Sequence, residues 1–263
     1  MNTIRKLGIG VGAVLAVAVP HGADAAISFA GASGQLAASV TFDVVAGTNL
    51  QVVLTNTSLS DVLVPADILT GVFFSGVPIV TPVSGILTAG SSVFYDPDGQ
   101  PAGGNVGGEW AYATGLVGAP GGATSGISSA GFNLFGQANF NGPDLSNPTA
   151  VNGMNYGILS AGDNTATQNG GIINSGGQIK NSVTFTLSGL PQGFNLGSIS
   201  NVSFQYGTSL TEPNIPGGGL CPNGAPNFPI CSPQVETPEP MSMAMLGIGL
   251  AGLGVARMRR RQA

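Results

Sequence analysis

Three acidic residues and the only tryptophan lie close together near the middle of the chain, and these side chains are the best suited to chemistry. Asp96 and Asp98 are followed by Glu109, which directly precedes Trp110. Glycoside hydrolysis needs two carboxyl groups, and an aromatic ring often stacks on the sugar. The sequence therefore allows a carbohydrate-active enzyme that uses these acids. Trp110 and Tyr112, one strand period apart, could offer the stacking face, but burial in the core is the commoner outcome for such rings.

The stretch Asp96-Pro97-Asp98-Gly99 also has a second interpretation. Two aspartates two residues apart begin many calcium-binding loops, so Asp96 and Asp98 are a weak candidate calcium site. Asp at the first position, Pro at the second and Gly at the fourth are equally the residues that a type I turn prefers. We favour the turn alone.

Alternation of apolar and polar residues dominates the body of the chain and predicts short strands with few helices. Residues 37–45 and 49–56 predict a hairpin around Ala46-Gly47-Thr48, with Leu50, Val52 and Leu54 on one face of its second strand. Residues 179–187 and 199–206 predict a closing pair of strands across 189–197. Further short strands are predicted over 68–74, 77–82, 91–95 and 109–114.

These strands indicate a mainly β protein with an antiparallel β-sandwich or jelly-roll-like domain. Residues 99–177 hold 20 glycines, about a quarter of the segment against a usual ~7 %. We expect long Gly/Asn-rich loops with short strands that cover the sandwich, the alternative being a flexible, partly disordered insert. Residues 213–237 are again rich in Pro and Gly and predict a stalk.

The amino-terminus has the pattern of a secretory signal peptide over residues 1–25. Arg5 and Lys6 precede an apolar stretch over 7–19, and Ala23-Asp24-Ala25 supplies small residues around the cleavage site. Cleavage after Ala25 would begin the mature chain at Ala26. An uncleaved anchor is the alternative, but the apolar stretch is shorter than the ~20 residues that span a bilayer.

The carboxyl-terminus has three successive elements over residues 238–263. Pro238-Glu239-Pro240 comes first, and an apolar stretch over 241–256 predicts a short transmembrane helix. Four arginines then end it and would stay in the cytoplasm, which places the body on the other side of the membrane. The alternatives are a plain membrane anchor and a buried amphipathic helix with a basic surface tip. The four arginines are Arg257, Arg259, Arg260 and Arg261.

These three elements together resemble the PEP-CTERM tail, the sorting signal that exosortases read in Gram-negative bacteria. The resemblance covers about 29 of the 263 residues. It implies export, cleavage near Pro238-Glu239-Pro240, a transient inner-membrane anchor, and then release to the cell surface or extracellular matrix. Signal peptidase and an exosortase would be the processing enzymes, and exopolysaccharide a possible partner. The same tail has been labelled an ice-binding-protein C-terminal domain, a label that gives no reliable evidence for ice binding.

Composition excludes several kinds of function for the mature chain. Between Ala26 and Pro240 there are eleven acids and one base, Lys180, which gives a net charge of −10. Such a body cannot neutralise a phosphate backbone, so nucleic acid is excluded as a partner. The sole histidine, His21, lies in the signal peptide, which removes catalytic mechanisms and metal sites that need histidine. We expect no catalytic centre and no cofactor.

Cys221 and Cys231 are the only cysteines and enclose a Pro/Gly-rich loop. In an exported chain the simplest expectation is a disulfide between them. A two-cysteine metal site is the alternative, disfavoured because no histidine is available as a further ligand.

The pattern as a whole predicts a non-catalytic structural or adhesive protein of the cell surface, linked to exopolysaccharide or biofilm. The alternatives are the carboxylate-dependent enzyme described above and a ligand- or ice-binding module. No regular Thr-x-Thr repeat supports the ice-binding alternative.

Overall fold

The computed structural model describes residues 26–96, 98–136, 138–146, 151, 153–167, 169–174 and 176–219. Within these ranges, no helix has the length and apolar character needed to cross a membrane. The predicted signal peptide, the Cys221–Cys231 pair and the predicted tail over 238–263 lie outside the described residues.

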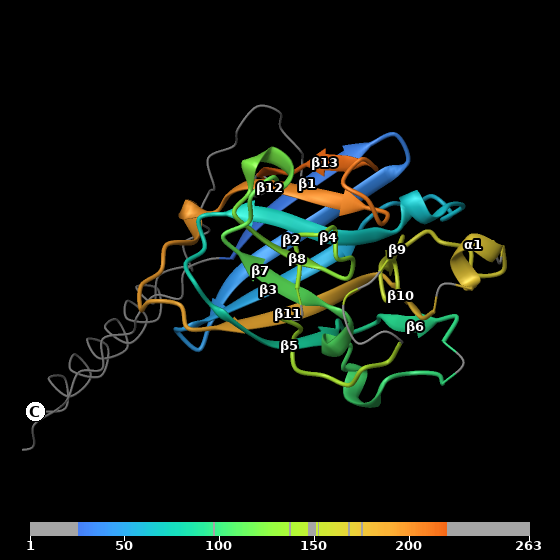
Figure 1. The fold of residues 1–263 in the computed structure, drawn as a ribbon, viewed down its shortest axis with the longest axis horizontal. Helices are drawn as coiled ribbons and strands as arrows, with labels where there is room; N and C mark the ends of the chain where they lie inside the picture. Colours follow the sequence, from blue (N-terminus) through green and yellow to red (C-terminus); the bar gives the residue numbers. More distant parts are fainter. Residues whose placement is uncertain are drawn as a thin grey trace, which may run out of the picture.

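The described chain forms two β-sheets that pack as a sandwich (Figure 1). Among the described residues, the named strands pair in antiparallel fashion except for β9 with β10. The first sheet has the order β14 (Gly218–Gly219), β1 (Ile27–Ser33), β2 (Leu36–Val45), β3 (Asn49–Asn56), β11 (Ser182–Ser188), β5 (Thr81–Leu87). The second has the order β13 (Asn214–Pro216), β12 (Ser200–Tyr206), β4 (Leu69–Ser75), β9 (Ile158–Leu159), β10 (Gln178–Lys180), β6 (Ser92–Phe94). The strands β8 (Ser125–Ser128) and β7 (Ala111–Thr114) extend this second sheet from β4.

Within the part of the chain that the structure describes, helical structure is limited to short segments. A single α-helical turn, α1, is capped by the side chain of Asn169, which accepts from the backbone N–H of Gly171. The described helical segments are α1 (Gly170–Ile173), η1 (Pro65–Asp67), η2 (Ala102–Gly104), η3 (Gly107–Glu109), η4 (Pro120–Gly122) and η5 (Leu196–Ser198).

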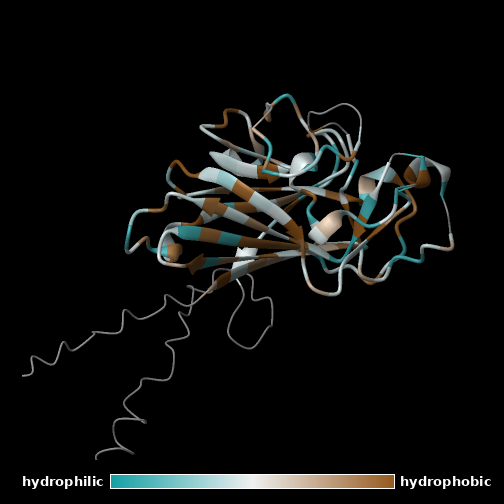
Figure 2. Cartoon of the chain, turned by 90° about the horizontal axis from the view of Figure 1, so that it is seen from below, coloured by the Kyte–Doolittle hydropathy of each residue, from teal (hydrophilic) through white to brown (hydrophobic). Residues whose placement is uncertain are grey.

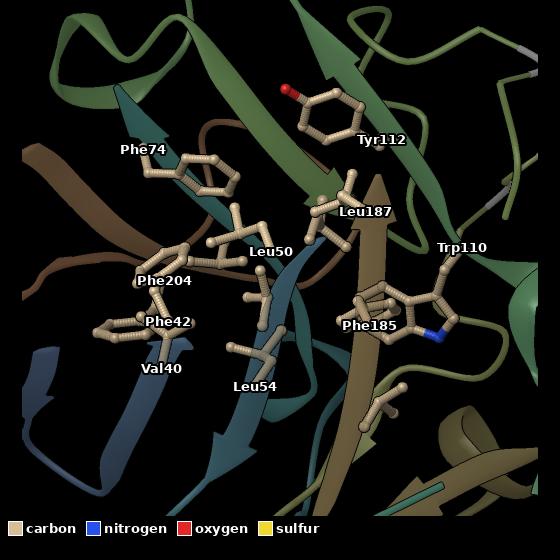
Figure 3. Close-up of a cluster of buried hydrophobic side chains, with 14 of the residues drawn as sticks. Val40, Phe42, Leu50, Leu54, Phe74, Trp110, Tyr112, Phe185, Leu187 and Phe204 are labelled. Atoms are coloured by element: carbon tan, nitrogen blue, oxygen red, sulfur yellow. The ribbon is translucent and has the colours of Figure 1, made fainter. Parts of the chain in front are cut away.

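One large apolar core fills the space between the sheets (Figure 3). Phe42 of β2 meets Phe74 of β4 edge to face, with ring centroids 5.2 Å apart. Phe185 of β11 packs against Trp110 at 5.0 Å and against Phe140 at 5.1 Å. Hydrophobic residues recur along the strands of both sheets (Figure 2). Burial of these inward faces is the main source of stability, since each large side chain contributes about 1.5–3 kcal/mol.

The predicted hairpin over 37–56 is confirmed. β2 and β3 pair from Ala38 with Asn56 to Val45 with Asn49, and residues 46–48 form the turn. Every second residue of β3 is buried, as the alternation predicts, because side chains of a strand point to opposite faces in turn.

The predicted single strand over 179–187 is wrong, because the chain changes sheet in its middle. Asn181 has a positive φ of 88° and separates β10 from β11. β10 belongs to the second sheet and β11 to the first, so the predicted pairing of 179–187 with 199–206 does not form. Asn tolerates a positive φ better than other non-glycine residues, which lets the strand direction break here without a glycine.

Other strand predictions need smaller corrections. The strand predicted over 77–82 begins later, as β5, and Glu109 lies in η3 rather than in β7. The strands that were not predicted are β1, β8, β9, β13 and β14. The predicted stalk over 213–237 also begins later than expected, since β13 and β14 join its first residues to the body.

The glycine-rich segment over 99–177 supplies strands and a third layer. It contributes β7, β8 and β9 to the second sheet. Phe73 of β4 points away from the main core and packs against Phe132 and Phe135 of this segment, at ring distances of 6.2 and 5.9 Å. The second sheet is therefore covered on both faces, and all seven residues of β4 are buried.

Phe185 is the core residue whose removal should cost most, because it is fully buried and contacts aromatic rings from two loops. We expect Phe185→Ala to lower the free energy of unfolding by about 3–5 kcal/mol. The control is Thr186→Ala on the partly exposed face of the same strand, which should cost less than about 1 kcal/mol. Urea denaturation of both variants is the measurement, and equal losses would contradict this core assignment.

Candidate functional site

Asp96 is held within its own turn and by a tyrosine. Its side chain accepts from the backbone N–H of Asp98 at 2.7 Å, and its carbonyl accepts from Gly99 at 3.2 Å. The hydroxyl of Tyr156 donates to the other carboxylate oxygen. The i to i+3 hydrogen bond is the one that a β-turn makes, in agreement with the turn prediction for this segment.

Glu109 is buried and holds a neighbouring loop. One carboxylate oxygen accepts from the backbone N–H groups of Leu145 and Ser146 at 2.6 and 2.9 Å, and the other accepts from the Ser146 hydroxyl. Burial raises the pKa of Glu109, and these hydrogen bonds partly oppose that rise. Each oxygen thus has a structural partner, so this acid works as a loop anchor.

The three predicted acids do share a neighbourhood. The pKa of Tyr156 is raised first by burial, then by its hydrogen bond to Asp96, and then by the negative charges of Asp96, Glu109 and Asp98. Trp110 and Tyr112 are buried in the main core. The predicted sugar-stacking face is therefore wrong, and the core interpretation of these two rings is confirmed.

A second acidic pair, which the sequence analysis did not single out, lies where two polar loops meet. One loop follows β3 and the other follows β9. Their backbones are joined by hydrogen bonds from Ala161 to Asn56 at 3.3 Å and from Gly162 to Ser58 at 3.1 Å. These contacts bring Asp61 and Asp163, 102 positions apart in the sequence, into one place.

Each aspartate of this pair holds the opposite loop. Asp163 accepts from the backbone N–H of Val62 at 3.1 Å. Asp61 accepts from the backbone N–H of Asn164 at 2.9 Å and from the hydroxyl of Thr167 at 2.7 Å. Removal of either carboxylate would therefore leave backbone N–H groups of the facing loop without their acceptor.

The reciprocal bonds place the two carboxyl groups side by side, and their pKa values move in opposite directions. The pKa of Asp61 is lowered, mainly by its bonds from Thr167 and Asn164. The pKa of Asp163 is raised, mainly by burial and also by the nearby Asp61. Asp163 is only 6 % exposed, so its charge is poorly solvated.

Lys180, the only base predicted for the mature chain, is adjacent. Its amino group donates to the backbone carbonyl of Asp163 at 2.6 Å. Tyr95 reaches the same region, where its hydroxyl donates to the carbonyl of Thr165 at 3.3 Å. Burial raises the pKa of Tyr95, and the charges of Asp163 and Asp61 raise it further.

Glycine makes the close approach of the two loops possible. A Cβ at position 162 would lie 2.1 Å from the carbonyl oxygen of Leu59. Beneath the loops, a small apolar cluster of Val62, Ile68, Leu159 and Ile172 fixes their position. The end of the sandwich near β6, β9, β10 and α1 is therefore built of well-packed loops (Figure 1).

A separate hollow of about 520 Å³ opens on the third layer. None of its lining residues is charged, so it brings no acid or base to a bound molecule. The lining residues are Gly131, Phe132, Asn133, Phe135, Val151, Gly153 and Thr208.

Comparison of the chain with protein-family models, with curated proteins and with solved structures found no match. The predicted sorting residues and cysteines lie outside the described residues, as does the predicted cleavage site apart from Ala26, and these predictions stay untested.

Asp163 should give the stability a distinct pH dependence. A raised pKa in the folded state means that folding binds a proton, so the free energy of unfolding should fall as pH rises from about 4 through the folded pKa. Asp61, with its lowered pKa, contributes in the opposite direction and loses its contribution as pH falls. Asp163→Asn should reduce the fall at rising pH and leave the part that comes from Glu109, whose pKa is also raised, whereas Asp43→Asn on β2 should keep the whole fall. Urea denaturation across pH with a chelator present measures this, and superimposable wild-type and Asp163→Asn profiles would refute it.

Proposed function

We propose that the protein is an exported, exosortase-sorted protein of the cell surface or extracellular matrix, with a non-catalytic structural or adhesive role. Its sandwich or jelly-roll-like body is the part that remains after both ends are processed. Exopolysaccharide is the partner that this location offers.

The hydrogen bonds that Glu109 and Asp96 make within the protein support the non-catalytic part of this proposal. A catalytic carboxyl group must be free to reach substrate, and a general acid must also gain and lose a proton. Glu109 instead accepts three hydrogen bonds within the protein, and Asp96 is bonded to Tyr156 and to its own turn. These contacts support a structural role for the acids that were the candidates for glycosidase chemistry.

The two ends of the described chain lie at one edge of the sandwich, and this position supports the proposal that both ends are open to processing enzymes. β1 pairs with β14, so Phe29 lies opposite Gly219 and the described chain begins and ends at the same edge of the first sheet. A processing enzyme that acts on a segment following this edge need not displace the core. The polar loops around Asp61 and Asp163 lie away from that edge, beside α1 and β9 (Figure 1).

The sorting motif gives the first test. Replacing Pro238, Glu239 and Pro240 together by alanine should block cleavage and leave the protein in the membrane fraction, because the processing enzyme loses its recognition sequence. Glu236→Ala, just outside the motif, should be processed normally. The intact mass of endogenous wild-type protein should begin at Ala26 and end near residues 238–240. A wild-type mass that retains residues 241–263 would contradict exosortase processing.

Retention by the matrix gives the second test. We expect endogenous protein released from cells to bind purified exopolysaccharide of the host and to leave the polymer uncleaved, because its acids serve structural roles. The measurements are retention on a polymer column against a blank column, and polymer length after incubation. Absence from both the polymer column and a glycan array would contradict a matrix role, and polymer shortening that is lost in Glu109→Gln would favour the enzyme.

A further inference from the structure

Asp61 and Asp163 lie together, because each carboxylate accepts from the backbone N–H of the residue that follows the other aspartate. Asp163 uses one carboxylate oxygen for the N–H of Val62, and its other oxygen, Oδ2, is buried without a hydrogen-bond partner. The polar group beside Asp163 is the carboxyl of Asp61, which already accepts from the opposite loop. An unpartnered buried acceptor costs about 1–3 kcal/mol, and more for a charged group.

Either a proton or a cation can relieve this arrangement. A shared proton would leave one carboxyl neutral, as in other close carboxylate pairs. A cation would instead allow both groups to ionise, as the usual pKa of aspartate favours at neutral pH. The high negative charge expected for the mature body also raises the local concentration of cations.

We propose that Asp61 and Asp163 form a binding site for a divalent cation, with calcium as the ion. Oδ2 of Asp163 and the carboxylate of Asp61 are the charged ligands, and water completes the shell from the partly exposed side of Asp61. The chemistry selects a hard ion, because only oxygen ligands are at hand and calcium accepts irregular sets of carboxylate, carbonyl and water oxygens. Magnesium is a poorer fit, since it demands near-ideal octahedral geometry.

Lys180 sets the strength of this site. Its amino group lies on the backbone carbonyl of Asp163, so its positive charge opposes that of the cation. With two carboxylates and a nearby lysine, we expect a Kd on the order of 10⁻⁴–10⁻³ M, the range of extracellular calcium modules. The site would fill in a calcium-containing medium and empty when calcium is depleted.

Calcium-dependent stability of the purified full-length chain tests the proposal. After chelator treatment, millimolar CaCl2 should raise the Tm of the wild type, whereas NaCl of equal ionic strength should not. Asp163→Asn and Asp61→Asn should each weaken calcium binding at least about tenfold, because each removes one of two charged ligands. Asp43→Asn, which removes one charge from β2 near the turn end of the hairpin and away from the loop that follows β3, should bind calcium as the wild type does.

The variant Lys180→Gln distinguishes two explanations of the aspartate pair: a site that a cation fills, and a pair whose negative charge Lys180 alone neutralises. Loss of the lysine charge should tighten calcium binding by about tenfold if the cation occupies this place. Circular dichroism without calcium checks that each variant is folded. The proposal falls if calcium leaves the Tm of the wild type unchanged, if Asp163→Asn responds as the wild type does, or if Lys180→Gln loses stability that calcium does not restore.

Discussion

The double burial of β4 is the constraint on which the rest of the structure depends. Residues that alternate along this strand face two different cores, with Phe74 toward the facing sheet and Phe73 toward the outer loops. A strand that is apolar on both faces needs cover on both sides. The glycine-rich segment provides the outer cover, and so this segment is part of the fold rather than an appendage. Its loops, once fixed by this packing, can hold polar side chains in defined positions.

Strands could be predicted from the sequence where one face of the strand is exposed to solvent and the other is buried. The alternation in residues 37–56 identified the hairpin and its buried face, because its two faces differ in polarity. The same method failed at Asn181, where alternation continues across a change of sheet and only the backbone conformation marks the break. It also missed β8, whose sequence Ser-Gly-Ile-Ser has one apolar side chain and is buried by its neighbours.

Of the candidate site residues, only those that are close together in the sequence could be predicted to lie together. Asp96 and Glu109 are near in sequence, and the structure does gather them around Tyr156. The pair of Asp61 and Asp163 depends on backbone hydrogen bonds between two loops and on the absence of a side chain at Gly162. Neither aspartate stands in a motif, so composition and spacing could not join them. A search for acids in polar loops directly after strands would have included both, along with others.

The pairing of β14 with β1 has a mechanical consequence. In this antiparallel pair the described chain enters and leaves the sandwich at the same end, with Phe29 opposite Gly219 and Ala30 opposite Gly218. A force that pulls these two ends apart therefore loads the pairs one after another, as in the opening of a zipper, rather than all together in shear. Each step breaks few hydrogen bonds, each of net value about 1 kcal/mol. Tension applied across the two ends would thus peel away β14 and then β13 at low force, while the central strands of both sheets stayed intact.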